Sequence, residues 1–174
     1  RSWNDEARKR LAAGGKVLLT LPAGTQTRGT MPQRFLPVFW SLSWFPKQPG
    51  HMGIYCDPSH PALAGFPTAS GSDFQWWDVT ENSAAFILDG MDAGLRPIIQ
   101  VIDDYHRNHK LGAVFETKAG RGRLLVSAFD LDGGLDNRPA ARQLRASLLA
   151  YMHGPRFAPR MEVPQATLAK LLAQ

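Results

Sequence analysis

The sequence is poor in cysteine, and this scarcity excludes two common ways of stabilising a small domain. Cys56 is the single cysteine among 174 residues. An internal disulfide framework and a zinc cluster built from cysteines both need more than one thiol. At this length the chain is about one domain in size and can bury a hydrophobic core without such cross-links. We therefore expect a single domain over residues 1–174.

Long apolar runs and a concentrated charge are missing as well. No stretch approaches the ~20 apolar residues that a membrane-spanning helix needs, and no signal peptide opens the chain. Lysine and arginine total 20 against 15 acidic residues, and this net charge of +5 is spread along the chain. Nucleic-acid-binding proteins usually gather their basic residues on one face. We expect neither a membrane span nor a nucleic-acid partner.

The chain also begins without a methionine. Arg1 is followed almost directly by a short helical pattern and an apolar strand, so we expect the chain to be a piece of a longer protein. A targeting signal could then lie upstream of Arg1. The compartment stays open, and a periplasmic or secreted location is compatible with such a signal.

Three strand-like segments lie close together in the second half of the chain. Pro97–Ile102 and Leu124–Phe129 are nearly unbroken apolar runs, typical of strands covered on both faces. Ala113–Thr117 is a third strand candidate, and the glycine-containing segment Lys118–Gly122 separates it from the last one. This spacing predicts an antiparallel hairpin over Ala113–Phe129.

Helical and strand patterns also occur at both ends. Asp5–Ala13 has acids in its first turn and bases near its end, and Lys16–Leu21 is apolar, so the pair resembles one unit of a parallel sheet. Ala140–Met152 is an amphipathic helix pattern that Asp136–Asn137 could cap. Pro22–Gly53 shows no periodicity and is rich in aromatics. Its aromatic side chains could cover the sheet, contact a neighbouring domain or stack on a sugar.

A strongly polar connection follows the first of the three strands. It contains Asp103, Asp104, His106, Arg107, His109 and Lys110. Two histidines and a carboxylate could ligate a metal. The spacing is loose, however, and the two neighbouring cations would repel a metal ion. We therefore expect a polar loop whose charges bond to the backbone and to one another, with no metal.

Catalytic side chains are hard to identify from the sequence. Cys56 lacks the glycine-flanked turn of an activated nucleophile, so we expect an inert, partly buried thiol. Carboxylates at the strand ends could act as a pair in an independent hydrolase; the candidates are Asp103, Asp104, Glu116 and Asp130. Exposed tryptophans could instead make the chain a carbohydrate-binding module, with Trp40, Trp44, Trp76 and Trp77 as candidate platforms.

Four segments together resemble a known family. They are HRNHKLGAVFETKAGRGRLLVSAFDL at residues 106–131, Cys56–Pro61, Trp76–Asp78 and Arg138–Gln143. The set resembles the C-terminal region of large bacterial family 2 glycoside hydrolases, which are β-galactosidase-like enzymes with a sugar-binding jelly roll and a TIM barrel. In those enzymes the tail is similar to a class I glutamine amidotransferase-like domain. The resemblance covers most of the chain from about Phe35 to Met152.

The resemblance implies a fold and a role. The fold would be a three-layer α/β domain with a mostly parallel sheet, glutamine amidotransferase-like or flavodoxin-like, with the antiparallel hairpin at its edge. The family's catalytic carboxylates belong to a barrel of roughly 200 residues or more, which this chain cannot supply. The amidotransferase nucleophile lies in a Gly-x-Cys-x-Gly elbow that Cys56 does not match. No catalytic residue and no cofactor is therefore carried over.

We accordingly expect a non-catalytic accessory domain of a carbohydrate-degrading hydrolase. It would support the barrel, mediate homo-oligomer formation or contribute to the substrate cleft, with the barrel, the jelly roll and carbohydrate as partners. The alternatives are a stand-alone carbohydrate-binding module and an independent carboxylate-based hydrolase. The residues expected to contact a ligand or a neighbouring domain are Trp76, Trp77, Asp104, His106, Arg107 and His109.

Overall fold

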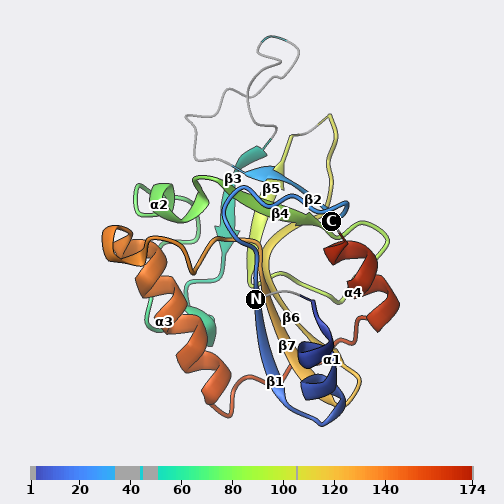
Figure 1. Ribbon diagram of the computed structural model, residues 1–174. Helices are drawn as coiled ribbons and strands as arrows, with labels where there is room; N and C mark the ends of the chain where they lie inside the picture. Colours follow the sequence, from blue (N-terminus) through green and yellow to red (C-terminus); the bar gives the residue numbers. More distant parts are fainter. Residues whose placement is uncertain (1–2, 34–43, 45–50, 105, 174) are drawn as a thin grey trace.

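The computed structural model of the chain describes residues 3–33, 44, 51–104 and 106–173. Within these residues the chain forms seven strands, four α-helices and two short 3-10 helices (Figure 1). In chain order they are α1 (Asp5–Ala12), β1 (Lys16–Thr20), β2 (Thr30–Gln33), β3 (His51–Cys56), η1 (Pro61–Leu63), α2 (Trp76–Thr80), β4 (Ser83–Ile87), β5 (Ile99–Asp103), β6 (Leu111–Ala119), β7 (Gly122–Ser127), η2 (Leu135–Asn137), α3 (Pro139–His153) and α4 (Gln165–Leu172).

All seven strands belong to one sheet organised around β6. One edge of β6 pairs with β7, which in turn pairs with β1. The other side of the sheet continues from β6 through β5 to β3, and β4 connects the start of β6 to β2. The hairpin expected over Ala113–Phe129 is confirmed, since Val114 lies opposite Ser127 and Ala119 opposite Gly122. It lies in the middle of the sheet, however, and its expected position at the edge is wrong.

The expected three-layer fold with a mostly parallel sheet is wrong as well. Among the strands of the described residues, β1 and β7 run parallel, while the other five strand pairings are antiparallel. Parallel neighbours need long crossover connections, usually helices. The chain instead joins β5 to β6 and β6 to β7 through short loops. The long apolar runs indicated strands covered on both faces, and antiparallel strands between two apolar layers give the same pattern.

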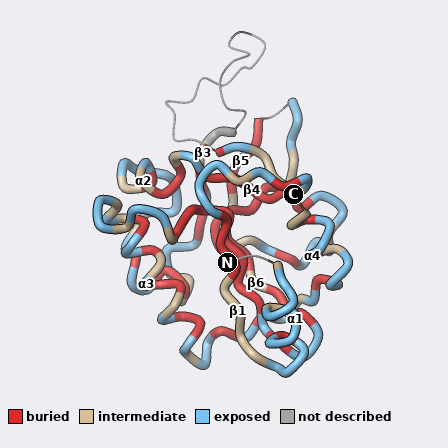
Figure 2. Tube along the Cα trace, in the orientation of Figure 1, coloured by how far each residue is buried: buried red, intermediate tan, exposed pale blue. Residues whose placement is uncertain are grey.

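Two apolar clusters cover the two faces of the sheet (Figures 1 and 2). On one face α3, α2 and η1 pack through Leu144, Trp76 and Leu63. On the other face α1 and α4 pack through Leu11 and Leu168. In Figure 2 the central strands are the most continuously buried part of the chain. None of the helices in the described ranges is long and apolar enough to cross a membrane.

Local sequence signals explain how two helices begin. Asn4 caps α1, because its Oδ1 accepts a hydrogen bond of 2.9 Å from the backbone nitrogen of Ala7. Pro139 occupies the first turn of α3, where its missing N–H costs nothing. The expected cap of α3 by Asp136–Asn137 is wrong, since those residues form η2 and no adjacent side chain caps the helix. A distant carboxylate, described below, takes that role.

Candidate ligand-binding site

The polar connection between β5 and β6 is held together by its own carboxylates. Asp103 is buried, and its carboxylate accepts hydrogen bonds of 2.8 Å from the backbone nitrogens of Asp104 and His109. The guanidinium of Arg107 donates to the same carboxylate, with 3.2 Å from Nε to either oxygen. Asp104 Oδ1 accepts from the backbone nitrogen of His106 at 2.8 Å. The interpretation as a self-bonded polar loop is confirmed.

Hydrogen bonds favour the ionised form of two carboxylates in and beside this loop, those of Asp103 and Asp89. Burial alone would raise the pKa of Asp103, but the bonds from Arg107, His109 and Asp104 hold that pKa below its usual range. His109 Nδ1 contacts the carboxylate of Asp89, which lies beyond the end of β4, and this hydrogen bond lowers the pKa of Asp89. The loop therefore joins β5 to the β4 side of the sheet. In the described part of the chain, no group of three or more His, Cys, Asp or Glu side chains is placed to hold a metal ion.

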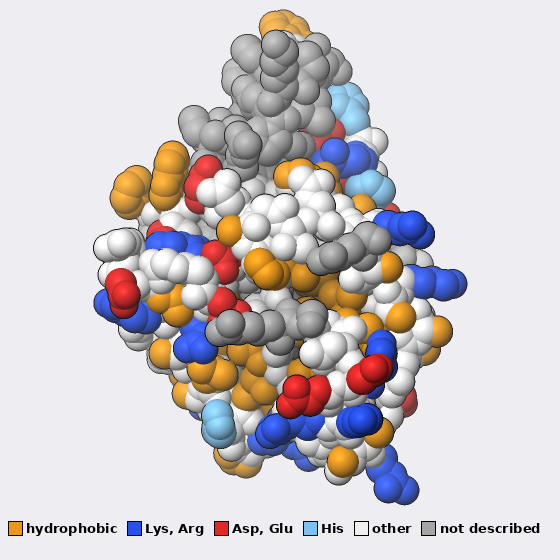
Figure 3. Space-filling model, in the orientation of Figure 1, with side chains coloured by type: hydrophobic (Ala, Val, Ile, Leu, Met, Phe, Trp, Pro, Cys, Tyr) orange, Lys and Arg blue, Asp and Glu red, His pale blue; other side chains and the backbone are white. Residues whose placement is uncertain are grey.

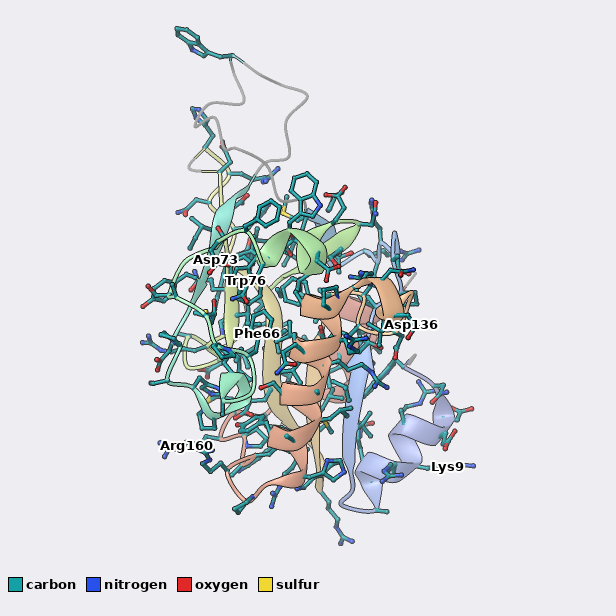
Figure 4. All side chains as sticks on the ribbon, turned by 90° about the vertical axis from the view of Figure 1, so that its left-hand side faces the viewer. Lys9, Phe66, Asp73, Trp76, Asp136 and Arg160 are labelled. Atoms are coloured by element: carbon teal, nitrogen blue, oxygen red, sulfur yellow. The ribbon has the colours of Figure 1, made fainter. Side chains whose placement is uncertain are left out.

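The two adjacent tryptophans have different environments. Trp76 is fully buried, its ring centroid lies 5.0 Å from that of Phe66, and its Nε1 donates to Thr68 Oγ1 at 3.0 Å (Figure 4). Trp77 is 46% exposed and stacks on Phe74, which is 82% exposed, at 6.4 Å between centroids. Trp76 is thus a core residue and Trp77 a surface residue. Of the other candidate platforms, Trp44 is 71% exposed and Trp40 lies outside the described residues.

An ion-pair cluster joins α2 to the start of α3. Asp78 Oδ2 accepts from the backbone nitrogens of Ala140 and Ala141 at 3.0 and 3.1 Å, which caps α3 from outside its own segment. Arg138 donates from Nε to Asp78 Oδ1 at 3.1 Å and from Nη1 to Asp130 Oδ2 at 2.9 Å. Two of the segments that carry the family resemblance, Trp76–Asp78 and Arg138–Gln143, therefore meet here. Asp130, a candidate acid in the sequence, has a structural role in this cluster.

The remaining two segments meet at a cavity of about 540 Å³, which we call the β3–β6 cavity. It lies among the end of β3, the turn that follows it, β5, the segment before β5, and β6. Its polar lining consists of Tyr55, Asp57, His60, Arg96, Gln100, Lys110 and Glu116. The lining thus includes an aromatic ring, two cations, two carboxylates, an imidazole and an amide.

Glu116 is a carboxylate in the cavity lining whose pKa is raised above its usual value. Its Oε2 accepts a hydrogen bond of 2.7 Å from the hydroxyl of Tyr151, a residue of α3 that is 6% exposed. Burial raises the pKa of Glu116 above its usual value, and the hydrogen bond from Tyr151 opposes this only in part. The Glu116 side chain as a whole is half-buried and lines the cavity.

His60 is a neutral hydrogen-bond donor in the cavity wall. Burial lowers the pKa of the His60 imidazole, and its Nδ1 accepts from the backbone nitrogen of Ala62 at 3.2 Å. The proton of the neutral ring must then lie on Nε2. The ring packs edge-on against Tyr151, with 5.5 Å between centroids. Glu116, Tyr151 and His60 therefore form one contiguous group.

Cys56 lies next to this group but is not activated. The thiol is buried, and its Sγ lies 3.5 Å from the carbonyl oxygen of Ala69, to which it donates. Burial raises the pKa of Cys56, and the negative charges of Asp57 and Asp73 raise it further. The sequence predicted a partly buried thiol, and the structure buries it almost completely; its inertness stays a prediction.

Sequence reasoning identified only part of the cavity. Glu116 was a candidate acid at a strand end, and His60 lies in one of the four segments that carry the family resemblance, but Tyr55 and Arg96 gave no recognisable signal. Their proximity depends on β3 pairing with β5, and a single sequence does not reveal which strands pair. Of the six residues expected to contact a ligand or another domain, none lines the cavity.

Lysine and arginine side chains are scattered among acidic ones on the face shown in Figure 3, so the surface chemistry there is mixed.

Comparison with known proteins identifies a family without a described activity. No curated protein matches the chain. A protein-family model described as a domain of unknown function, DUF8487, matches residues 1–173. The chain therefore belongs to the DUF8487 family.

Proposed function

We propose that this chain is a non-catalytic accessory domain of a carbohydrate-degrading glycoside hydrolase related to family 2. In such an enzyme it would support the catalytic barrel, an oligomer interface or the substrate cleft. The starting point is the resemblance of four segments to the C-terminal region of those enzymes. Two of these segments, which are distant in sequence, are joined by Asp78 and Arg138, and two contribute to the β3–β6 cavity.

The observation that carries this proposal is the structural role of four of the five candidate catalytic groups, all except Glu116. Asp103 and Asp104 accept from backbone nitrogens of their own loop, and Asp130 pairs with Arg138. Cys56 is a buried thiol whose pKa is raised, whereas a catalytic cysteine needs a lowered pKa. Each of these groups therefore has a structural role that does not require chemistry.

Activity assays test the proposal directly. The purified chain would be incubated with aryl β-glycosides and, separately, with glutamine. We expect no turnover above the rate of a buffer blank. Turnover that disappears in Glu116→Gln or Cys56→Ser would contradict the proposal, because it would assign catalysis to this domain.

The exposed pair Phe74 and Trp77 favours a second candidate, a carbohydrate-binding module. Stacked aromatic side chains on the surface can serve as a platform for a sugar ring, and they can equally serve as a contact for another protein surface. Titration calorimetry with soluble oligosaccharides would measure binding of a sugar to this pair. Affinity that is lost in Trp77→Ala but kept in the control Tyr55→Ala would support this candidate, and affinity that is kept in Trp77→Ala would count against it.

A further inference from the structure

We propose that the β3–β6 cavity binds a neutral oligosaccharide, which stacks on Tyr55 and forms hydrogen bonds with Glu116, His60 and Gln100. This inference rests on the proposed function and extends it, since it places the carbohydrate in the cavity and not on the Phe74–Trp77 pair. Three properties of the cavity lead to it, namely its dimensions, its balance of charge and its exposed aromatic ring.

The dimensions suit a small elongated ligand. A volume of about 540 Å³ lies within the usual range for small-molecule sites, roughly 300–1,000 Å³. Lys110 and Glu116 both line the cavity and lie in or next to the extended strand β6. At a rise of roughly 3.3 Å per residue, their Cα atoms are on the order of 20 Å apart. The lining residues are therefore distributed along β6, so a ligand of more than one sugar ring could contact both Lys110 and Glu116.

The charge balance favours an uncharged ligand. Arg96 and Lys110 contribute two cations to the lining, and Asp57 and Glu116 contribute two acids. An anion would meet the two carboxylates, and a cation would meet the guanidinium and the ammonium group. Hydroxyl groups both donate and accept hydrogen bonds, so a polyhydroxylated neutral ligand can use side chains of either sign.

The aromatic ring and its neighbours are arranged for such a ligand. Tyr55 is 56% exposed although it belongs to the sheet, and it lies directly opposite Gln100 in the pairing of β3 with β5. Residues opposite each other project from the same face, so a ring surface and an amide lie side by side. His60 adds an Nε2–H donor, and Glu116 adds a carboxylate to the lining. Apolar stacking and hydrogen bonding are thus available within one cavity.

Titration of the full chain with two neutral disaccharides, lactose and cellobiose, tests the inference. Chemical-shift changes in NMR spectra would report both affinity and location, and sodium glucuronate would serve as the charged comparison. We expect saturable binding of at least one neutral disaccharide, tighter than that of glucuronate. Tyr55→Ala should weaken binding about tenfold through loss of the stacked ring, while Tyr55→Phe and Trp77→Ala should stay within about threefold of the parent chain.

Several outcomes would overturn the inference. Absence of saturable binding of either disaccharide, tighter binding of glucuronate, or loss of binding in Trp77→Ala but not in Tyr55→Ala would each contradict it. Glu116→Gln offers a second variant of nearly unchanged shape should Tyr55→Ala unfold, and we expect it to perturb the same NMR signals. The turnover assays with aryl β-glycosides and glutamine test the proposed function separately. If the chain showed neither sugar binding nor turnover, the inference about the cavity would be refuted and the proposed non-catalytic role would stand.

Discussion

At the scale of single residues, the most informative contact is that of Glu116 with Tyr151. The Tyr151 hydroxyl lies 2.7 Å from Glu116 Oε2 and 3.3 Å from the carbonyl oxygen of Arg156. A hydroxyl has one hydrogen, so it cannot donate fully to both acceptors. If Glu116 takes up a proton, it can donate to the phenol oxygen, and the phenol can then donate to Arg156. Protonation thus satisfies all three groups. Burial is what raises the pKa of Glu116, and the hydrogen bond from the Tyr151 hydroxyl opposes that rise.

The burial of Glu116 gives the stability of the protein a pH dependence. Because folding raises the pKa of Glu116, its contribution to stability is complete below the pKa of the unfolded chain and is lost as pH rises through the folded value. Glu116→Gln resembles the protonated form and cannot ionise. We expect the melting temperature of Glu116→Gln, relative to the parent chain, to be higher at pH 7.5 than at pH 4. Calorimetric unfolding at both pH values measures this, and an equal difference at the two would contradict it.

At the scale of elements, the start of α3 depends on a side chain from α2. Helix N-termini leave backbone N–H groups without partners, and a nearby Ser, Thr, Asp or Asn normally satisfies them. Here Asp78 bonds to Ala140 and Ala141 from another element. The capping interaction thereby fixes the position of α3 relative to α2, which an adjacent cap could not do.

Removing this carboxylate should therefore loosen the helix end. We expect Asp78→Ala to lower the free energy of unfolding by about 2 kcal/mol, since a lost cap costs roughly 0.5–2 kcal/mol and Arg138 also loses a partner. Hydrogen exchange should quicken in the first turn of α3. Asp136→Ala, which removes an exposed carboxylate close to the same helix, is the matched control and should change stability by less than about 0.5 kcal/mol. Equal losses in the two variants would argue against a capping role.

The elements themselves were largely predictable, but their partners were not. The helix at Ala140–Met152 and the hairpin at Ala113–Phe129 followed from spacing and turn chemistry, which are local properties. β2 was missed, because it is a four-residue strand containing Pro32 and has no alternating pattern. The cap on α3 was assigned to its sequence neighbours, because nothing local indicates that Asp78 reaches it. The cavity was missed for the same reason, since it depends on Tyr55 lying opposite Gln100.

At the scale of the whole molecule, the central hairpin connects the two apolar layers. Phe115 of β6 is fully buried and meets Phe86 of β4 edge to face, with 5.7 Å between centroids. Glu116, the next residue, points to the opposite side of the strand, toward the cavity and Tyr151. A single strand thus contributes to the core with one residue and to the candidate site with its neighbour.

Truncation of this core should be far more costly than truncation of a surface ring. We expect Phe115→Ala to lower the free energy of unfolding by about 3–5 kcal/mol, as is usual for a buried phenylalanine. Phe74→Ala, which removes a ring that is 82% exposed, should change it by no more than about 0.5 kcal/mol. Urea unfolding of the two variants provides the comparison. Similar losses in both would mean that the sheet does not depend on this contact.

The parallel pairing of β1 with β7 also has a consequence for the order in which the chain folds during synthesis. β1 is made before β7, and the other five strands of the described residues are made between them. Until then the apolar residues Val17, Leu18 and Leu19 belong to a strand without its neighbour. Such long-range pairing slows folding and exposes strands to aggregation. We therefore expect newly made chains that end before Ser127 to need chaperone protection at β1.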